Sequence, residues 1–155
     1  MRKRRRPGLS LVERALIERN WHATAVVAQI HALIGDDSDR MVSASGRVLY
    51  VVLGAAIAEE IDSEQPEIRI IRGAVNAVHD QAGESDIPVT RRASIESGLL
   101  AAERLVPHFA RRSLIDSACE LELKLRRQHL HTSDFEALLA EIAGPQPALS
   151  ENGAR

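Results

Sequence analysis

The run VLYVVLGAAIA, residues 48–58, is the longest uninterrupted apolar stretch of the chain. Because it is apolar on every face of a helix, it predicts a helix at about residues 47–61 that is buried all round. Such a helix lies at the centre of a bundle or in a subunit interface. Gly54 and Ala58 are four residues apart and would let a neighbouring backbone approach closely. The positions predicted to contact another chain are Val48, Val51, Val52, Gly54, Ala55 and Ala58.

The same run is short for a membrane span. Its eleven residues make about 16 Å of helix, whereas the hydrocarbon core of a bilayer is roughly 30 Å thick. We therefore expect no membrane insertion.

A first helix is predicted before this run. Ser10 and Glu13 have the spacing of a capping box, and Gly35 is expected to end the helix with a left-handed backbone. A polar loop, residues 36–46, is expected to follow it. The apolar residues of this helix recur mostly at steps of three and four, interrupted at residues 19 and 20: Val12, Leu16, Ala23, Val27, Ile30 and Ile34.

Helical spacing of apolar residues predicts three further helices after an acidic link, at about residues 67–82, 89–109 and 114–125. Pro107 lacks a backbone N–H and clashes with the preceding turn, so a kink or break is expected there. A second capping-box motif, at residues 133–136, predicts a short last helix. The residues expected to face the core are Ile71, Ala74, Val75, Val78, Ile95, Leu99, Ala102, Val106, Phe109, Leu114, Ala118, Leu121 and Leu125.

The fold class follows from these segments. No stretch alternates apolar and polar residues, and no hairpin dipeptide separates two strand-like runs. The sequence predicts an all-α protein, a bundle of five or six helices in an antiparallel or orthogonal arrangement. One helical domain spans residues 9–144, between a flexible basic arm at residues 1–8 and a disordered tail at residues 145–155.

The composition indicates a bacterial, cytoplasmic protein. At 155 residues, the chain is long enough to bury one core without metals or disulfides. It has a single cysteine, Cys119, and no secretory signal, which fits a reducing cytoplasm. Eighteen of its twenty basic residues are Arg, as expected from a GC-rich bacterial genome.

The basic arm is the feature that favours nucleic acid as a partner. The chain carries a formal net charge of −2, but without the arm's five cations the rest has 15 basic and 22 acidic residues and repels phosphate. The basic pairs at residues 91–92 and 111–112 would extend a phosphate-binding track if they shared a face. The candidate nucleic-acid contacts are Arg2, Lys3, Arg4, Arg5 and Arg6.

Two histidines precede glycines by four residues, His31 before Gly35 and His79 before Gly83. Each histidine would lie in the last turn of a helix, where it can hydrogen-bond free carbonyl groups or complement the negative helix end. The pattern therefore predicts two helix ends, each with a glycine cap.

The segment HALIG, residues 31–35, also resembles the His-x-Leu-Lys-Gly core of histidine phosphotransfer domains, which are all-helical. The resemblance covers His31, Leu33 and Gly35, while Ile34 stands where that family has lysine. It implies a phosphoryl acceptor at His31. The three aspartates within residues 36–39 would oppose the added negative charge.

Few other residues have a spacing suited to chemistry. Glu18 and His22 share a helical face, and His129 and His131 lie two apart, but Glu-x-x-His occurs nowhere in the chain. Asp116 and Glu120 flank Cys119 and would raise the pKa of its thiol. We expect no catalytic residue, no metal and no cofactor.

The function predicted from the sequence is a non-enzymatic helical module for protein interaction. It would act as an adaptor, chaperone-like binder or regulator, as a homodimer in the bacterial cytoplasm, with itself and another protein as partners. The alternative is a DNA-associated regulator that uses residues 2–6, and the third possibility is phosphotransfer at His31.

Overall fold

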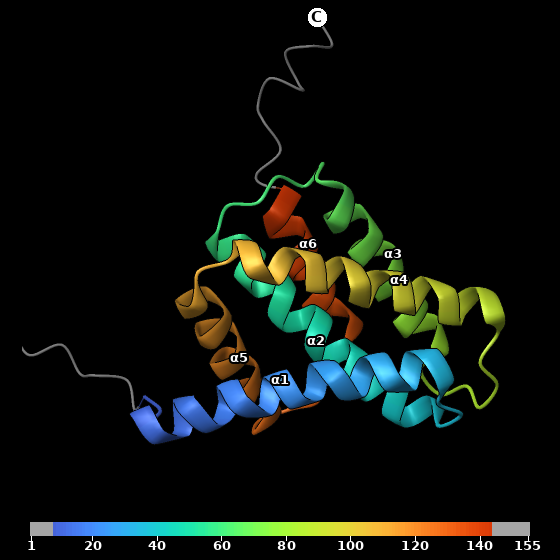
Figure 1. Ribbon diagram of the computed structural model, residues 1–155, viewed down its shortest axis with the longest axis horizontal. Coiled ribbons are helices and arrows are strands. Elements are labelled where there is room, and N and C mark those ends of the chain that lie inside the picture. Colours follow the sequence, from blue (N-terminus) through green and yellow to red (C-terminus); the bar gives the residue numbers. More distant parts are fainter. Residues whose placement is uncertain (1–7, 144–155) are drawn as a thin grey trace, which may run out of the picture.

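The computed structural model describes residues 8–143 (Figure 1). These residues form helices and no strand, which confirms the all-α class. The basic residues 2–6 and the tail from residue 145 lie outside the described residues. The helices are α1 (Leu11–Ile34), α2 (Ser38–Ala58), α3 (Pro66–Gln81), α4 (Val89–Leu105), the 3-10 helix η1 (Val106–His108), α5 (Arg111–Leu125) and α6 (Thr132–Ala143).

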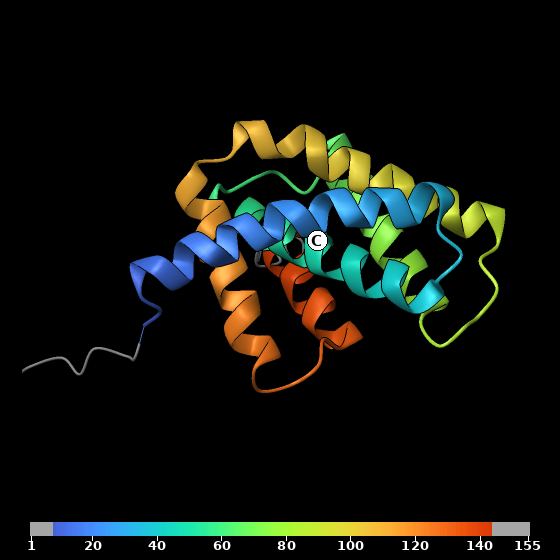
Figure 2. The ribbon, with the colours of Figure 1, turned by 60° about the horizontal axis from the view of Figure 1, so that its bottom comes forward.

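Helix α2 is the central element, and it packs against α1, α3, α4, α5 and α6 (Figures 1 and 2). Most of its apolar residues are enclosed; Val51, Val52 and Leu53, for example, are completely buried. The sequence predicted that this helix lies at the centre of a bundle or in a subunit interface. In the structure it lies at the centre of the bundle.

Helix α2 begins at Ser38, nine residues before the predicted start. The Asp37 carboxylate caps it by accepting a hydrogen bond from the Arg40 N–H (3.1 Å). The segment predicted as a polar loop instead forms the first turns, because its residues at positions 38, 41, 44 and 45 are all buried. Small polar side chains on a packed face concealed this helix in the sequence.

The additional turns at the start of α2 make this helix longer than the apolar run that was compared with a membrane span. Helix α2 has 21 residues, and an 18-residue window within it has a mean hydropathy of 1.7, so it could cross a membrane by length and composition. However, 67% of that window is buried inside the fold, as in the core helix of a globular protein.

Helix α1 lies along the outside of the bundle (Figure 2). The predicted capping box is confirmed: the Glu13 N–H donates to Ser10 Oγ (3.1 Å), and the Ser10 N–H donates to Glu13 Oε2 (2.9 Å). The helix buries Trp21, Ala28 and Ala32 against the core, none of which belongs to the predicted apolar stripe.

The apolar positions predicted for α3, α4 and α5 are buried or half-buried as expected. The break at Pro107 is also confirmed, since α4 ends at Leu105, η1 follows, and Phe109 is extended before α5. Two close contacts bring these helices together. A Cβ atom built on Gly98 of α4 would lie 2.0 Å from the Ala74 Cβ of α3, and one on Gly54 would lie 2.2 Å from the Ser117 Oγ of α5.

Helix α6 begins one residue before the predicted capping box. The side chain of Asp134 accepts a hydrogen bond from the His131 N–H (2.8 Å), so this pair occupies the place expected for Ser133 and Glu136. Phe135 packs edge-on against Tyr50 of α2, with the ring centroids 5.8 Å apart.

Candidate functional site

The outer side of α1 exposes large apolar side chains along its whole length. Seven of them have between 43% and 82% of their surface exposed: Val12, Leu16, Val26, Val27, Ile30, Leu33 and Ile34. At about 100° per residue, their common direction is opposite to that of Trp21, Ala28 and Ala32, which face the core. These seven residues, with Ala23 between them, are called the α1 face below. The stripe predicted from the sequence is thus real, but it faces away from the core.

The α1 face has the spacing of a coiled-coil seam. Starting at Val12, steps of four and three alternate through the helix to Leu33. The one polar residue in this series is Arg19. The full series is Val12, Leu16, Arg19, Ala23, Val26, Ile30 and Leu33, and each of these residues is exposed.

The interface predicted on α2 has to be corrected. Val51, Val52 and Ala55 have no exposed surface, and Val48 is 4% exposed, so a second chain cannot reach them in this fold. Gly54 is packed against Ser117, and only Ala58 of the six residues is exposed. The apolar run is covered by the helices of its own chain.

The end of α1 is capped by a residue that the sequence did not suggest. Arg92 of α4 donates hydrogen bonds to the carbonyl oxygens of His31 (3.0 Å), Ala32 (2.9 Å) and Gly35 (2.5 Å). Gly35 is extended, with φ −73°, rather than left-handed. A glycine fits here because a Cβ would lie 2.8 Å from the His31 carbonyl oxygen. The predicted left-handed cap at Gly35 was therefore wrong.

The second histidine and glycine pair differs from the first. Gly83 has φ +82°, so the predicted left-handed glycine after α3 is confirmed. The His79 ring, however, joins α3 to another helix: its Nδ1 lies 2.6 Å from the Thr132 Oγ1 of α6.

Glu59 caps α5 in the same long-range manner as Arg92 caps α1. Its carboxylate accepts hydrogen bonds from the Ala110 N–H (2.7 Å) and the Ser113 hydroxyl (2.8 Å). These bonds lower the pKa of Glu59. Neither of these two caps can be recognised from the sequence at the helix end that it stabilises.

We predict that Arg92→Met lowers the free energy of unfolding by about 1–3 kcal/mol, because three helix-end carbonyls lose a charged hydrogen-bond donor. Urea denaturation measures this loss. Arg72→Met is the matched control, since Arg72 is an exposed arginine of α3 with no described hydrogen bond or ion pair. Equal stability of the two variants would contradict the capping role.

Glu18 and His22, which share a helical face and could form a metal-binding pair, contact other residues instead. Glu18 receives two hydrogen bonds from Arg111, at 2.7 Å and 2.6 Å, which hold its pKa below the usual value. The His22 ring packs against Trp21, with the ring centroids 5.0 Å apart. Within residues 8–143, no three His, Cys, Asp or Glu side chains are grouped closely enough to hold a metal ion.

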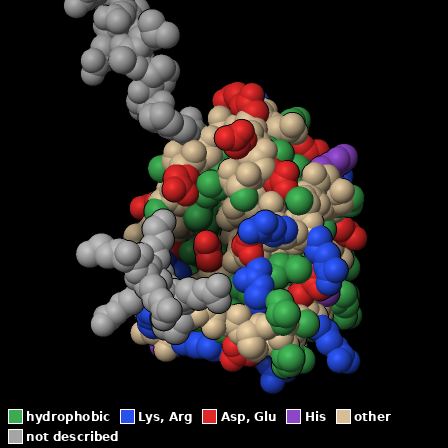
Figure 3. Space-filling view, turned by 90° about the vertical axis from the view of Figure 1, so that its left-hand side faces the viewer, with side chains coloured by type: hydrophobic (Ala, Val, Ile, Leu, Met, Phe, Trp, Pro, Cys, Tyr) green, Lys and Arg blue, Asp and Glu red, His purple; other side chains and the backbone are tan. Residues whose placement is uncertain are grey.

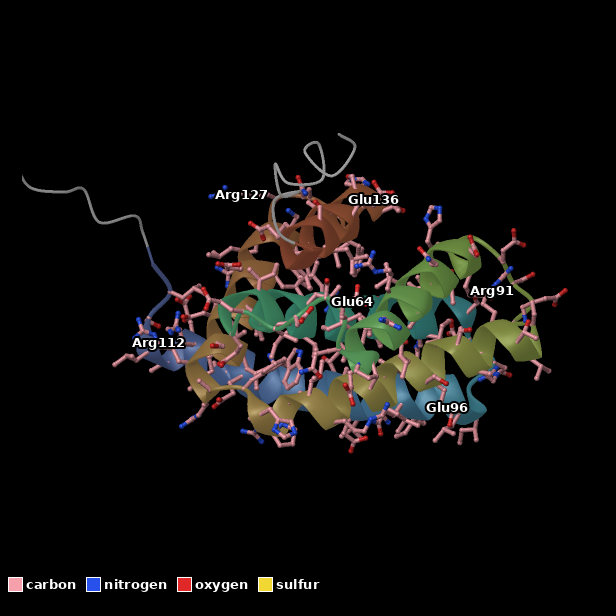
Figure 4. The ribbon with its side chains drawn as sticks, turned by 90° about the horizontal axis from the view of Figure 1, so that it is seen from above. Glu64, Arg91, Glu96, Arg112, Arg127 and Glu136 are labelled. Atoms are coloured by element: carbon pink, nitrogen blue, oxygen red, sulfur yellow. The ribbon has the colours of Figure 1, made fainter. Side chains whose placement is uncertain are left out.

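The two basic pairs do not form one track. Arg91 and Arg112 lie at opposite ends of the molecule (Figure 4). Arg92 is committed to the end of α1, and Arg111 to Glu18. Lys and Arg side chains do gather on the end of the bundle that carries Arg112, with acidic and hydrophobic side chains among them (Figure 3).

Three ionisable groups where α2, α5 and α6 meet have pKa values shifted away from neutrality. Lys124 Nζ lies 3.0 Å from Asp134 Oδ1, and this contact raises the pKa of Lys124. Burial acts to raise the pKa of Asp134, but the His131 N–H and Lys124 outweigh it and lower that pKa. Burial raises the pKa of Tyr50. None of these shifts moves a pKa toward neutrality, where a proton-transfer group would work best.

Cys119 is buried, and this burial raises the pKa of its thiol. Asp116 and Glu120 act in the same direction, as the sequence predicted, while Arg14 opposes them. We predict that a disulfide reagent such as Ellman's reagent modifies the native protein at least about 100-fold more slowly than the urea-unfolded protein, because the thiolate is both scarce and enclosed. Rapid modification of the native protein would contradict the burial.

No protein-family model, no curated protein and no solved structure matches the chain.

Proposed function

We propose that this protein is a non-enzymatic helical module for protein interaction, which acts as an adaptor, chaperone-like binder or regulator and forms a homodimer in the bacterial cytoplasm. The observation that carries the proposal is the α1 face. Seven large apolar side chains lie exposed on one side of a single helix, and contiguous exposed apolar surface of this kind marks interaction sites. We therefore propose a dimer interface on α1, since the residues first predicted on α2 are largely buried.

A second copy of the chain is the partner that this surface fits best. The coiled-coil spacing of the α1 face is complementary to another helix with the same spacing. The 24 residues of α1 make about 36 Å of helix, which offers three heptads to the partner. Two copies can pair through this one surface about a two-fold axis, the commonest closed assembly of soluble proteins.

Arg19 favours an antiparallel pair. In a parallel pair, Arg19 would face the partner's Arg19 in the middle of the seam, and two guanidinium groups would repel each other there. In an antiparallel pair, Arg19 can face the small side chain of the partner's Ala23. The same register sets Leu16 against the partner's Val26. Opposed helix dipoles add a small stabilising contribution.

Disulfide trapping tests both the surface and the orientation. The double variant Leu16→Cys with Val26→Cys, made in a Cys119→Ser background, is expected to form a covalent dimer in high yield on mild oxidation. Leu16→Cys alone is expected to cross-link poorly, because the two copies of residue 16 lie far apart in an antiparallel pair. Ala93→Cys, an exposed position of α4, measures cross-linking by random collision.

Efficient cross-linking of Leu16→Cys alone would overturn the antiparallel arrangement and indicate a parallel pair. Cross-linking of the double variant no faster than that of Ala93→Cys would overturn the α1 face as the interface. Leu16, Val26 and Ala93 are all exposed in the single chain, so the cysteines introduced there leave the core unchanged.

A further inference from the structure

A cleft of about 280 Å³ opens between α2, α3, α6 and the connector from α5 to α6. None of its lining residues belongs to α1, although Ser43 and Arg47 also line a neighbouring cleft that includes Ala23 and Val27 of α1. Its floor is apolar and comes from three helices: Leu49 of α2, Val75 and Val78 of α3, and Phe135 of α6 are all buried. This cavity is called the His79 cleft below.

Among the residues that line the His79 cleft, Arg47 alone carries a fixed charge. Arg47 and the three histidines His79, His129 and His131 line it, and no acidic residue does. Asp134, three residues after His131, is already paired with Lys124. The rim is thus suited to a negative group and offers no carboxylate that would repel one.

Arg47 is the available anion-binding group. It lies on an exposed position of α2, and no other residue between 8 and 143 makes an ion pair or side-chain hydrogen bond with it. A guanidinium group binds carboxylates through two parallel hydrogen bonds. The cleft therefore places an uncommitted cation beside a buried apolar floor.

The wall of the cleft is held in place by a contact between two helices. His79 Nδ1 and Thr132 Oγ1 lie 2.6 Å apart and join α3 to the first residue of α6. A largely apolar cavity with a few fixed polar groups is the usual form of a site for a small organic molecule.

We propose that the His79 cleft binds a small organic carboxylate, whose apolar body packs on Leu49, Val75 and Phe135 while its carboxylate pairs with Arg47. Apolar burial supplies affinity, and the charge pair supplies selection for an anion over a neutral molecule of the same shape. One chain supplies all the residues that line this site, so a monomeric protein would retain it.

The test uses octanoate as the probe, titrated into the full-length protein and followed by methyl NMR shifts and calorimetry. We expect saturable binding of one octanoate per chain, with shifts at the methyl groups of Leu49 and Val75. Octanamide, the neutral analogue, is expected to bind about tenfold more weakly or worse.

Two variants locate the site. Arg47→Gln is expected to weaken octanoate binding about tenfold, while Arg72→Gln, the control on the surface of α3, leaves it unchanged. Ala82→Phe places a large side chain at the exposed rim and is expected to block the cleft.

Absence of saturable octanoate binding would overturn the proposal. So would equal affinity in Arg47→Gln and wild type, equal affinity for octanamide, or undiminished binding in Ala82→Phe. Methyl shifts confined to residues outside the cleft would overturn it as well.

Discussion

Replacing both Leu16 and Ile30 by aspartate is expected to convert the proposed dimer into a monomer without changing the helix content. The two side chains are 52% and 49% exposed in the single chain, so the folded monomer tolerates carboxylates there. In the antiparallel pair, the same carboxylates would be buried against Val26 and Val12 of the partner subunit. A buried charge without a partner is strongly unfavourable.

We expect the dissociation constant of the dimer to rise at least about 100-fold in this variant, which corresponds to about 2.8 kcal/mol. Sedimentation equilibrium measures the mass, and far-ultraviolet circular dichroism measures the helix content. Leu123→Asp is the control, because Leu123 is also a partly exposed leucine (37%) but lies on α5, outside the α1 face. A double variant that stays dimeric, or a control that dissociates equally, would contradict the role of the α1 face.

The second large effect is expected where α3 and α4 approach most closely. Gly98→Ala adds a Cβ atom that would lie 2.0 Å from the Ala74 Cβ, so the helices must separate. Overpacking of this kind lowers the free energy of unfolding by about 1–3 kcal/mol. The reciprocal variant Gly98→Ala with Ala74→Gly moves the methyl group to the other helix and is expected to recover much of the loss.

Gly73→Ala is the control for this pair of variants. It is a helical glycine on α3 with no heavy atom within 4 Å of a built Cβ, so alanine is expected to raise stability by up to about 1 kcal/mol. Thermal and urea denaturation of the wild type and these three variants measure the differences in stability. Equal destabilisation by Gly98→Ala with and without Ala74→Gly would show that the close approach does not set the helix separation.

Apolar spacing predicted the core face correctly in α3, α4 and α5 because these helices have one apolar side each. Helix α1 has two. Its core side uses Trp21 with the small residues Ala28 and Ala32, whereas its outer side carries the larger aliphatic residues such as Leu16 and Ile30. Periodicity identifies an apolar stripe but not the surface that covers it, so the stronger stripe was mistaken for the internal one.

The features that the sequence did not predict depend on distant residues. Arg92 caps α1 from 57 to 61 positions away, and Glu59 caps α5 from 51 to 54 positions away. The start of α2 was missed because its first buried face includes Ser38 and Ser45. The His79 cleft joins residues of four helices and a connector, a grouping that only the packed bundle creates.

The mass of the wild-type protein in solution tests the central claim most directly. One chain has a mass of 17.0 kDa, and sedimentation equilibrium at micromolar concentration is expected to give twice that value. A mass of one chain over the whole accessible concentration range would contradict a homodimer formed through the α1 face.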